Sequence, residues 1–111
     1  MRWLFVTWVA VLGLAIGAEP DLAQLIASAN AGNNEAMYAV FLSIVQKGSE
    51  EHPISKEQEE VARYWLIKAG ESDNFRAARV LALCYEKGCF GVPVDLDRAR
   101  HYREIAKEAA P

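Results

Sequence analysis

The sequence predicts an all-α fold: a short α-solenoid of helical hairpins, with about five helices after a signal peptide. An apolar register of helical spacing occurs twice, with 41 residues between its copies. The two copies are Ala36, Val40 and Ile44, and Ala77, Leu81 and Tyr85. A second stretch of helical character follows each copy, at residues 60–65 and 97–102. Repeats of this length are typical of stacked helical hairpins, which usually serve to bind other molecules.

The turn between hairpins has the same length in both places. Twelve residues separate Gln24 from Ala36, and twelve separate Trp65 from Ala77. An equal turn length predicts that successive hairpins pack in the same way. The segment before the first hairpin is therefore interpreted as half of a hairpin that caps the stack. Within a hairpin the spacing varies, as expected for an outer loop where extra residues cost little entropy.

Residues 1–18 have the layout of a secretory signal peptide. Arg2 is followed by an apolar run at residues 3–16 and then by the small residues Gly17 and Ala18. We expect cleavage after Ala18, with cleavage after Gly17 as an alternative. The apolar run is shorter than the ~20 residues that span a bilayer, although retention as an N-terminal anchor stays open. The predicted location is the periplasm or the medium outside the cell.

The first mature helix is expected at about residues 21–31. Its apolar residues have the spacing of one helix face, and they are Leu22, Leu25, Ile26 and Ala29. Asp21 and Gln24 have the spacing of a capping box, and Gly32 is a typical C-terminal stop.

The second and third helices are separated by a polar loop. The second is expected at about residues 34–47 and ends at Gly48, and Pro53 prevents its continuation. Ser55 and Gln58 then have the spacing of a capping box for the third helix, which runs to about residue 70.

The last two helices complete the second repeat. Ser72 or Asp73 is expected to cap the fourth helix, which ends at Gly88. Asp95 is expected to cap the fifth, which runs to about residue 109, and this role is preferred to that of a catalytic acid.

The chain of 111 residues, 52% of them hydrophobic, is long enough for one small domain. Its predicted segments are a signal peptide (1–18), an N-terminal capping helix (19–32) and two repeats (33–71 and 72–111).

Cys84 and Cys89 are the two cysteines of the chain. If Gly88 is left-handed, the chain folds back and brings them within disulfide reach, at positions that contact each other in a Schellman motif. In an exported protein we expect a bond between them. The alternative is a buried Cys84 and an exposed thiol at Cys89. A redox enzyme is not expected, because the Cys-x-x-Cys spacing is absent.

The second repeat carries a recognisable motif on both of its helices. Its residues are Ala77, Leu81, Ala82, Tyr85 and Gly88, followed by Gly91, Val92, Asp95, Arg98 and Ala99. The first repeat carries the end of the motif as Ala62 and residues 65–71. These residues resemble the Sel1-like repeat, a tetratricopeptide-like family of helical hairpins, over nearly all of the chain after residue 18. Phe41 and Ala82 stand where the family has a close-packing glycine, and the first repeat lacks the Gly-Val-x-x-Asp loop.

The leading hypothesis is an exported module that binds another protein and is not an enzyme. In related tetratricopeptide proteins the first helix of each hairpin lines a concave face. The corresponding residues here are Glu35, Tyr38, Leu42, Val45 and Gln46, and Arg76, Arg79, Leu83, Glu86 and Lys87. Ordinary surface or core positions are the alternative interpretation for each of them. Some small exported Sel1-like proteins neutralise a toxin, so an immunity or adaptor role is the specific expectation.

Hydrolysis of a β-lactam or of peptidoglycan is the alternative function, because cysteine-rich Sel1-like proteins have been linked to that chemistry. The sequence offers no nucleophile paired with a base. His52 and His101 have no metal-ligand spacing around them, and no phosphate loop or nucleophile elbow occurs. We therefore expect no metal and no cofactor. Trp65 could be a binding aromatic, but its place in the motif favours core packing.

The net charge of −3 would become −4 on cleavage, because residues 1–18 contain one basic residue and no acidic one. This charge argues against a nucleic-acid partner, which requires a basic stripe. We expect no stable membrane insertion once the signal is removed. Two and a half hairpins leave apolar end faces, so a homodimer is a further expectation. A structural part of an envelope assembly is a third role.

Overall fold

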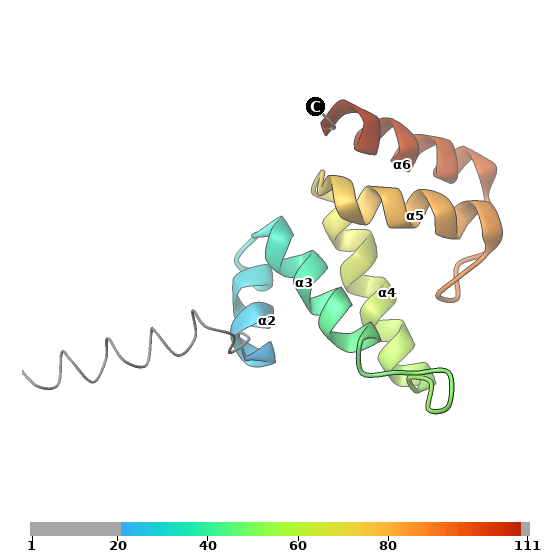
Figure 1. Ribbon diagram of the computed structural model, residues 1–111. Coiled ribbons are helices and arrows are strands. Elements are labelled where there is room, and N and C mark those ends of the chain that lie inside the picture. Colours follow the sequence, from blue (N-terminus) through green and yellow to red (C-terminus); the bar gives the residue numbers. More distant parts are fainter. Residues whose placement is uncertain (1–20, 110–111) are drawn as a thin grey trace, which may run out of the picture.

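The computed structural model describes residues 21–109, and this part of the chain is all-helical. Five helices follow one another: α2 (Leu22–Asn30), α3 (Asn34–Val45), α4 (Lys56–Glu71), α5 (Phe75–Lys87) and α6 (Leu96–Ala109) (Figure 1). No residue between 21 and 109 lies in a β-strand. The predicted all-α class is therefore confirmed.

The predicted signal peptide, residues 1–18, lies outside the described residues. The same holds for residues 19–20 of the predicted capping segment and for residues 110–111 of the second repeat. Of the helices within residues 21–109, none has the length and apolar character needed to cross a membrane.

Each helix packs against its neighbours in the sequence. The pairs in contact are α2 with α3, α3 with α4, α4 with α5, and α5 with α6. In Figure 1, α3 and α4 run side by side in opposite directions, and so do α5 and α6. One apolar core extends through all five helices.

The core combines small and large side chains. Its alanines without exposed surface are Ala62, Ala69, Ala77, Ala78 and Ala99, and its large members include Trp65, Leu66, Leu81 and Tyr102. The alanines let helix backbones approach, and the large side chains fill the space between them. Trp65 is buried, which agrees with the interpretation that it packs in the core.

α4 comes very close to the last two helices at Gly70. A Cβ atom on Gly70 would lie 2.5 Å from Cδ1 of Leu81 and 3.2 Å from Cε1 of Tyr102. Leu81 belongs to α5 and Tyr102 to α6, and both side chains are buried. The missing side chain of Gly70 therefore allows one position of α4 to contact both following helices.

The turns that end α2 and α4 have the same hydrogen bonds, shifted by 41 residues. The N–H to carbonyl bonds are Gly32 to Ala29 and Asn33 to Ser28 in the first turn, and Asp73 to Gly70 and Asn74 to Ala69 in the second. Both turns are Schellman motifs, in which one left-handed residue ends the helix. That residue is Gly32 (φ 101°) in the first turn and Asp73 (φ 66°) in the second.

Asn74 is the N-cap of α5, so the prediction that Ser72 or Asp73 caps this helix is wrong. The Oδ1 atom of Asn74 accepts a hydrogen bond from the N–H of Ala77 (3.0 Å). Ser72 and Asp73 cannot serve because they belong to the turn that ends α4. Asn33 has the same role in the first turn, where its side chain accepts from two N–H groups at the start of α3.

Two other predicted caps are confirmed. The hydroxyl of Ser55 accepts from the N–H of Gln58 (3.0 Å), and the Gln58 side chain accepts from the N–H of Ser55 (2.8 Å). This is the predicted capping box of α4. The Oδ1 atom of Asp95 accepts from the N–H groups of Asp97 and Arg98, both at 3.1 Å, at the start of α6.

Two helix ends differ from the prediction. Asp21 occupies the N-cap of α2, but its side chain makes no capping hydrogen bond. The N–H of Gln24 bonds instead to the backbone carbonyl of Asp21 (3.0 Å), so the predicted capping box is wrong. α3 ends at Val45, and Lys47 lies in the turn that follows.

The variant Asp73→Gly should be more stable than the natural protein. Asp73 is left-handed (φ 66°), a conformation that is unfavourable for a residue with a Cβ atom. Glycine removes this cost but adds freedom to the unfolded chain, so we expect a net gain of ~0.5–1 kcal/mol in the free energy of unfolding. Urea denaturation measures it.

Gly32→Ala is the matched reverse control for this prediction. A Cβ atom on Gly32 would meet no heavy atom within 4 Å, so the substitution tests the left-handed conformation alone. We expect a loss of ~1 kcal/mol. An Asp73→Gly variant that is less stable than the natural protein would show that the left-handed conformation of Asp73 does not destabilise the fold.

Candidate functional site

The segment after α5 is closed by a disulfide. Gly88 is left-handed (φ 80°), and its N–H donates to the carbonyl of Cys84 (2.6 Å). The chain turns back at this point, and the sulfur atoms of Cys84 and Cys89 are bonded, with their Cα atoms 4.7 Å apart. The disulfide and the left-handed glycine agree with the prediction. This turn has the single hydrogen bond of the simpler αL motif. It lacks the two hydrogen bonds of the predicted Schellman motif.

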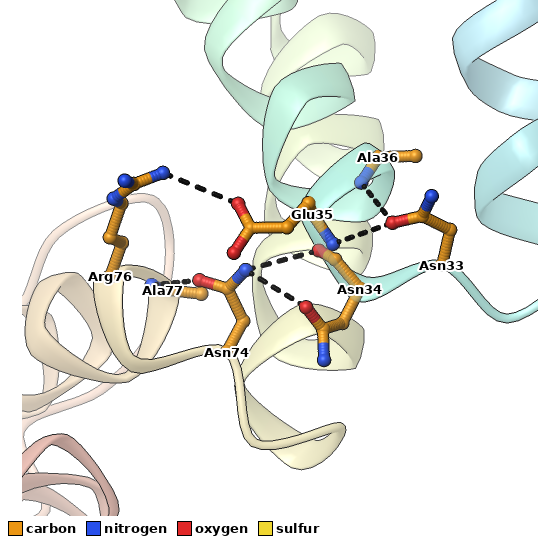
Figure 2. A network of polar contacts seen from close by, with 7 residues as sticks. All are labelled: Asn33, Asn34, Glu35, Ala36, Asn74, Arg76 and Ala77. Carbon is orange, nitrogen blue, oxygen red and sulfur yellow. Dashed lines mark hydrogen bonds and ion pairs between the residues drawn. The ribbon is translucent and has the colours of Figure 1, made fainter. Parts of the chain in front are cut away.

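A polar network between α3 and α5 contains two of the residues predicted to line a concave face. Glu35 and Arg76, each in the first turn of its helix, form an ion pair at 3.3 Å. Beside them the Nδ2 atom of Asn74 donates to the carbonyl and to Oδ1 of Asn34, both at 3.2 Å. Figure 2 shows that this network joins the start of α3 to the start of α5. Two of the ten predicted residues are therefore in direct contact.

The predicted residues further along α3 are partly covered. Tyr38, Leu42 and Val45 are half-buried and pack against the core, and the ring of Tyr38 stacks on that of Phe41 with 5.7 Å between centroids. Gln46 is exposed just after the helix. The apolar members of the set on α3 thus contribute to packing and keep only part of their surface accessible.

The predicted residues along α5 border a groove. Its lining consists of Arg79, Ala82, Leu83 and Glu86 of α5 and Arg103 and Ala106 of α6, and its volume is about 170 Å³. We call it the α5–α6 groove. Leu83 is 52% exposed. Arg103 and Glu86 form an ion pair across it at 3.4 Å. Lys87 is exposed at the end of α5 and is not part of the lining.

Sequence reasoning missed the half of this groove that α6 supplies. Arg103 and Ala106 are three residues apart on α6, and three-residue spacing places side chains on one helix face. That spacing was visible in the sequence, but a resemblance that assigns binding to the first helix of each hairpin gave no reason to include them. Ala82 was recognised as a packing residue only.

A second cleft lies along α4 and was not predicted. It has a volume of about 420 Å³ and is lined by Tyr64, Ile67, Lys68, Glu71 and Ser72. We call it the α4 cleft. The Nζ atom of Lys68 donates to the hydroxyl of Tyr64 (3.2 Å) and lies over its ring.

Other chemistry-bearing side chains in the described part are dispersed. Between residues 21 and 109, no three His, Cys, Asp or Glu residues are grouped so that they could hold a metal ion. His52 and His101 are both exposed. Burial raises the pKa of the Tyr102 phenol from 10.0 to about 12, and the neighbouring Glu71 carboxylate adds to the effect. The Tyr102 phenol therefore stays protonated at neutral pH.

Comparisons of the chain with protein-family models, with curated proteins and with solved structures found no match. The lining of the α5–α6 groove combines an exposed leucine, two arginines, a glutamate and two alanines. Such a lining can bury an apolar side chain and pair with a charged one.

Proposed function

We propose that this protein is an exported Sel1-like repeat protein that binds another protein and has no catalytic role, acting as an immunity or adaptor protein. The identical hydrogen bonds of the two inter-helix turns, 41 residues apart, support the proposed repeat and its arrangement as a short α-solenoid. The Cys84–Cys89 disulfide is compatible with an oxidising compartment such as the periplasm or the cell exterior.

The α5–α6 groove is the observation that carries this function. A single exposed leucine is common on protein surfaces, but Leu83 lies in a concave lining with Ala82 and Ala106. The same lining contains the charged side chains of Arg79, Glu86 and Arg103. Protein-binding surfaces have this composition, with an apolar centre and a polar rim in which arginine is enriched.

The first hairpin indicates what the groove accommodates. Forty-one residues before Arg79, Ala82, Leu83 and Glu86 stand Tyr38, Phe41, Leu42 and Val45. Phe41 is buried, whereas its equivalent Ala82 is much smaller and leaves the space of a side chain. A partner that supplies an apolar side chain to this groove would bury the surface of Leu83.

The rim adds a charge preference. Glu86 is already paired with Arg103, whereas Arg79 has no ion-pair partner within residues 21–109. A carboxylate on the partner would form charge-assisted hydrogen bonds with the guanidinium of Arg79. The proposed partner therefore presents an apolar residue next to an acidic one.

The double variant Arg79→Ala/Leu83→Ala should lose partner binding. The partner is first captured by crosslinking to the mature protein and identified by mass spectrometry, and its affinity is then measured by titration calorimetry. Truncating the apolar contact of Leu83 and the charged contact of Arg79 together should weaken binding by about 100-fold or more. Far-UV circular dichroism should show unchanged helicity, because both side chains are exposed.

The matched control is Val61→Ala/Lys68→Ala on α4, which also removes one exposed apolar and one exposed basic side chain. It should leave the affinity unchanged. Loss of binding in this control, with normal binding by the α5 variant, would assign the partner to the α4 side of the molecule. Turnover of a β-lactam or a peptidoglycan fragment by the purified protein would overturn the non-catalytic role.

A further inference from the structure

Phe90, in the loop after α5, has an unfavourable backbone conformation. Its φ angle is 54°, and the neighbouring Gly88 and Gly91 also have positive φ angles. Glycine adopts this region freely, but a bulky aromatic residue does so only when its surroundings hold it there. The contacts of Phe90 therefore have to offset the free-energy cost of this backbone conformation.

Three tethers hold Phe90, and each comes from a different helix. The adjacent Cys89 is bonded to Cys84 of α5. The Nη1 atom of Arg63 of α4 donates to the carbonyl of Phe90 (2.8 Å). The ring of Phe90 packs edge-on against Phe41 of α3, with 5.3 Å between centroids. The loop after α5 thus reaches both helices of the preceding hairpin.

We propose that the Cys84–Cys89 disulfide is a redox-sensitive latch that couples the second hairpin to the first. In the oxidised state the disulfide fixes the loop, so that Phe90 keeps its left-handed conformation and its ring stays packed against Phe41. In the reduced state Phe90 relaxes to a favourable backbone conformation, and its ring leaves Phe41. The contact within the second hairpin does not depend on this loop and persists.

The chemistry of release is ordinary thiol–disulfide exchange with a dithiol reductant. Cys84 is 1% exposed, whereas Cys89 is partly exposed, so the thiolate of the reductant attacks the sulfur of Cys89. The disulfide bond breaks, and Cys84 leaves as a thiolate and takes up a proton. The second thiol of the reductant then displaces Cys89 and forms the reductant's own disulfide, so two electrons pass to the protein.

Two aromatic pairs allow the latch to be tested within one sample. Phe41 and Phe90 report the contact between hairpins. Tyr85 of α5 and Tyr102 of α6 report the contact within the second hairpin, with stacked rings and 5.8 Å between centroids. Both pairs are close enough to give nuclear Overhauser effects between ring protons in a protein of this size.

The experiment compares the oxidised protein, the protein reduced with dithiothreitol, and the variant Cys84→Ser/Cys89→Ser. Reduction and the double variant should both remove the Phe41–Phe90 effect and leave the Tyr85–Tyr102 effect in place, and reoxidation should restore the first. Persistence of both effects would show that Phe90 is held without the disulfide and would overturn the latch. Loss of both would make the disulfide a general requirement of the second hairpin and would equally overturn it.

Discussion

The variant Asn74→Ala should lose ~2–4 kcal/mol of stability, more than an ordinary helix cap contributes. Asn74 is 2% exposed. Its Oδ1 atom caps α5 through the N–H of Ala77, and its Nδ2 atom donates to the carbonyl and to Oδ1 of Asn34 at the start of α3 (Figure 2). Alanine removes the cap, worth ~1 kcal/mol. It also leaves polar groups without partners in a partly buried site, at ~1–3 kcal/mol.

Asn33→Ala is the matched control, because Asn33 has the equivalent place 41 residues earlier. Asn33 is exposed and caps α3 only through backbone N–H groups of its own first turn. Its loss should cost ~1 kcal/mol. Equal losses for the two variants, measured by urea denaturation, would show that the hydrogen bonds between Asn74 and Asn34 contribute nothing to stability.

The protein should become less stable between pH 10 and 12 as its buried tyrosine ionises in the unfolded state. The pKa of Tyr102 is raised from 10.0 to about 12, first by burial and then by the charge of Glu71. In this window the folded protein keeps the phenolic proton, whereas the unfolded chain releases it. Unfolding therefore becomes more favourable as pH rises, by up to ~3 kcal/mol for two pKa units. Below pH 10 the contribution is fully present.

Tyr102→Phe removes this dependence and serves as the reference. The free energy of unfolding of the natural protein minus that of the variant should fall from pH 10 to 12. The ultraviolet absorbance of the phenolate should show a step near pH 12 that the variant lacks. The exposed Tyr64 is the control, since Tyr64→Phe should keep that step. A difference that does not change with pH would contradict the assignment.

The helices and two of their N-caps could be predicted because their signals are local. Ser55 with Gln58, and Asp95 with the residues after it, act within one helical turn, so spacing alone identifies them. The cap of α5 was assigned one or two residues too early. The hydrogen bonds that end α4 extend through Asp73 to Asn74, and a residue with a Cβ atom in the left-handed position gives a weaker stop signal than glycine.

The candidate site was predicted on one side only, because its other side depends on distant contacts. Arg79, Leu83 and Glu86 follow from the register of α5, but Arg103 and Ala106 join them only through the packing of α6 on α5. The Cys84–Cys89 bond was predictable, since five residues and a glycine define its geometry. The contacts of Phe90 with Phe41 and Arg63 connect residues 49 and 27 positions apart, and no local pattern indicates them.

The double role of Asn33 and Asn74 has a mechanical consequence. The backbone N–H of each asparagine donates to the end of the preceding helix, and its side chain caps the start of the following helix. The three residues between the helices in each turn, 31–33 and 72–74, all donate backbone hydrogen bonds to the preceding helix. We therefore expect each turn to be stiff and to set the direction of the next helix. Insertions would be tolerated between α3 and α4, where the connection from Gln46 to Ser55 is long and polar.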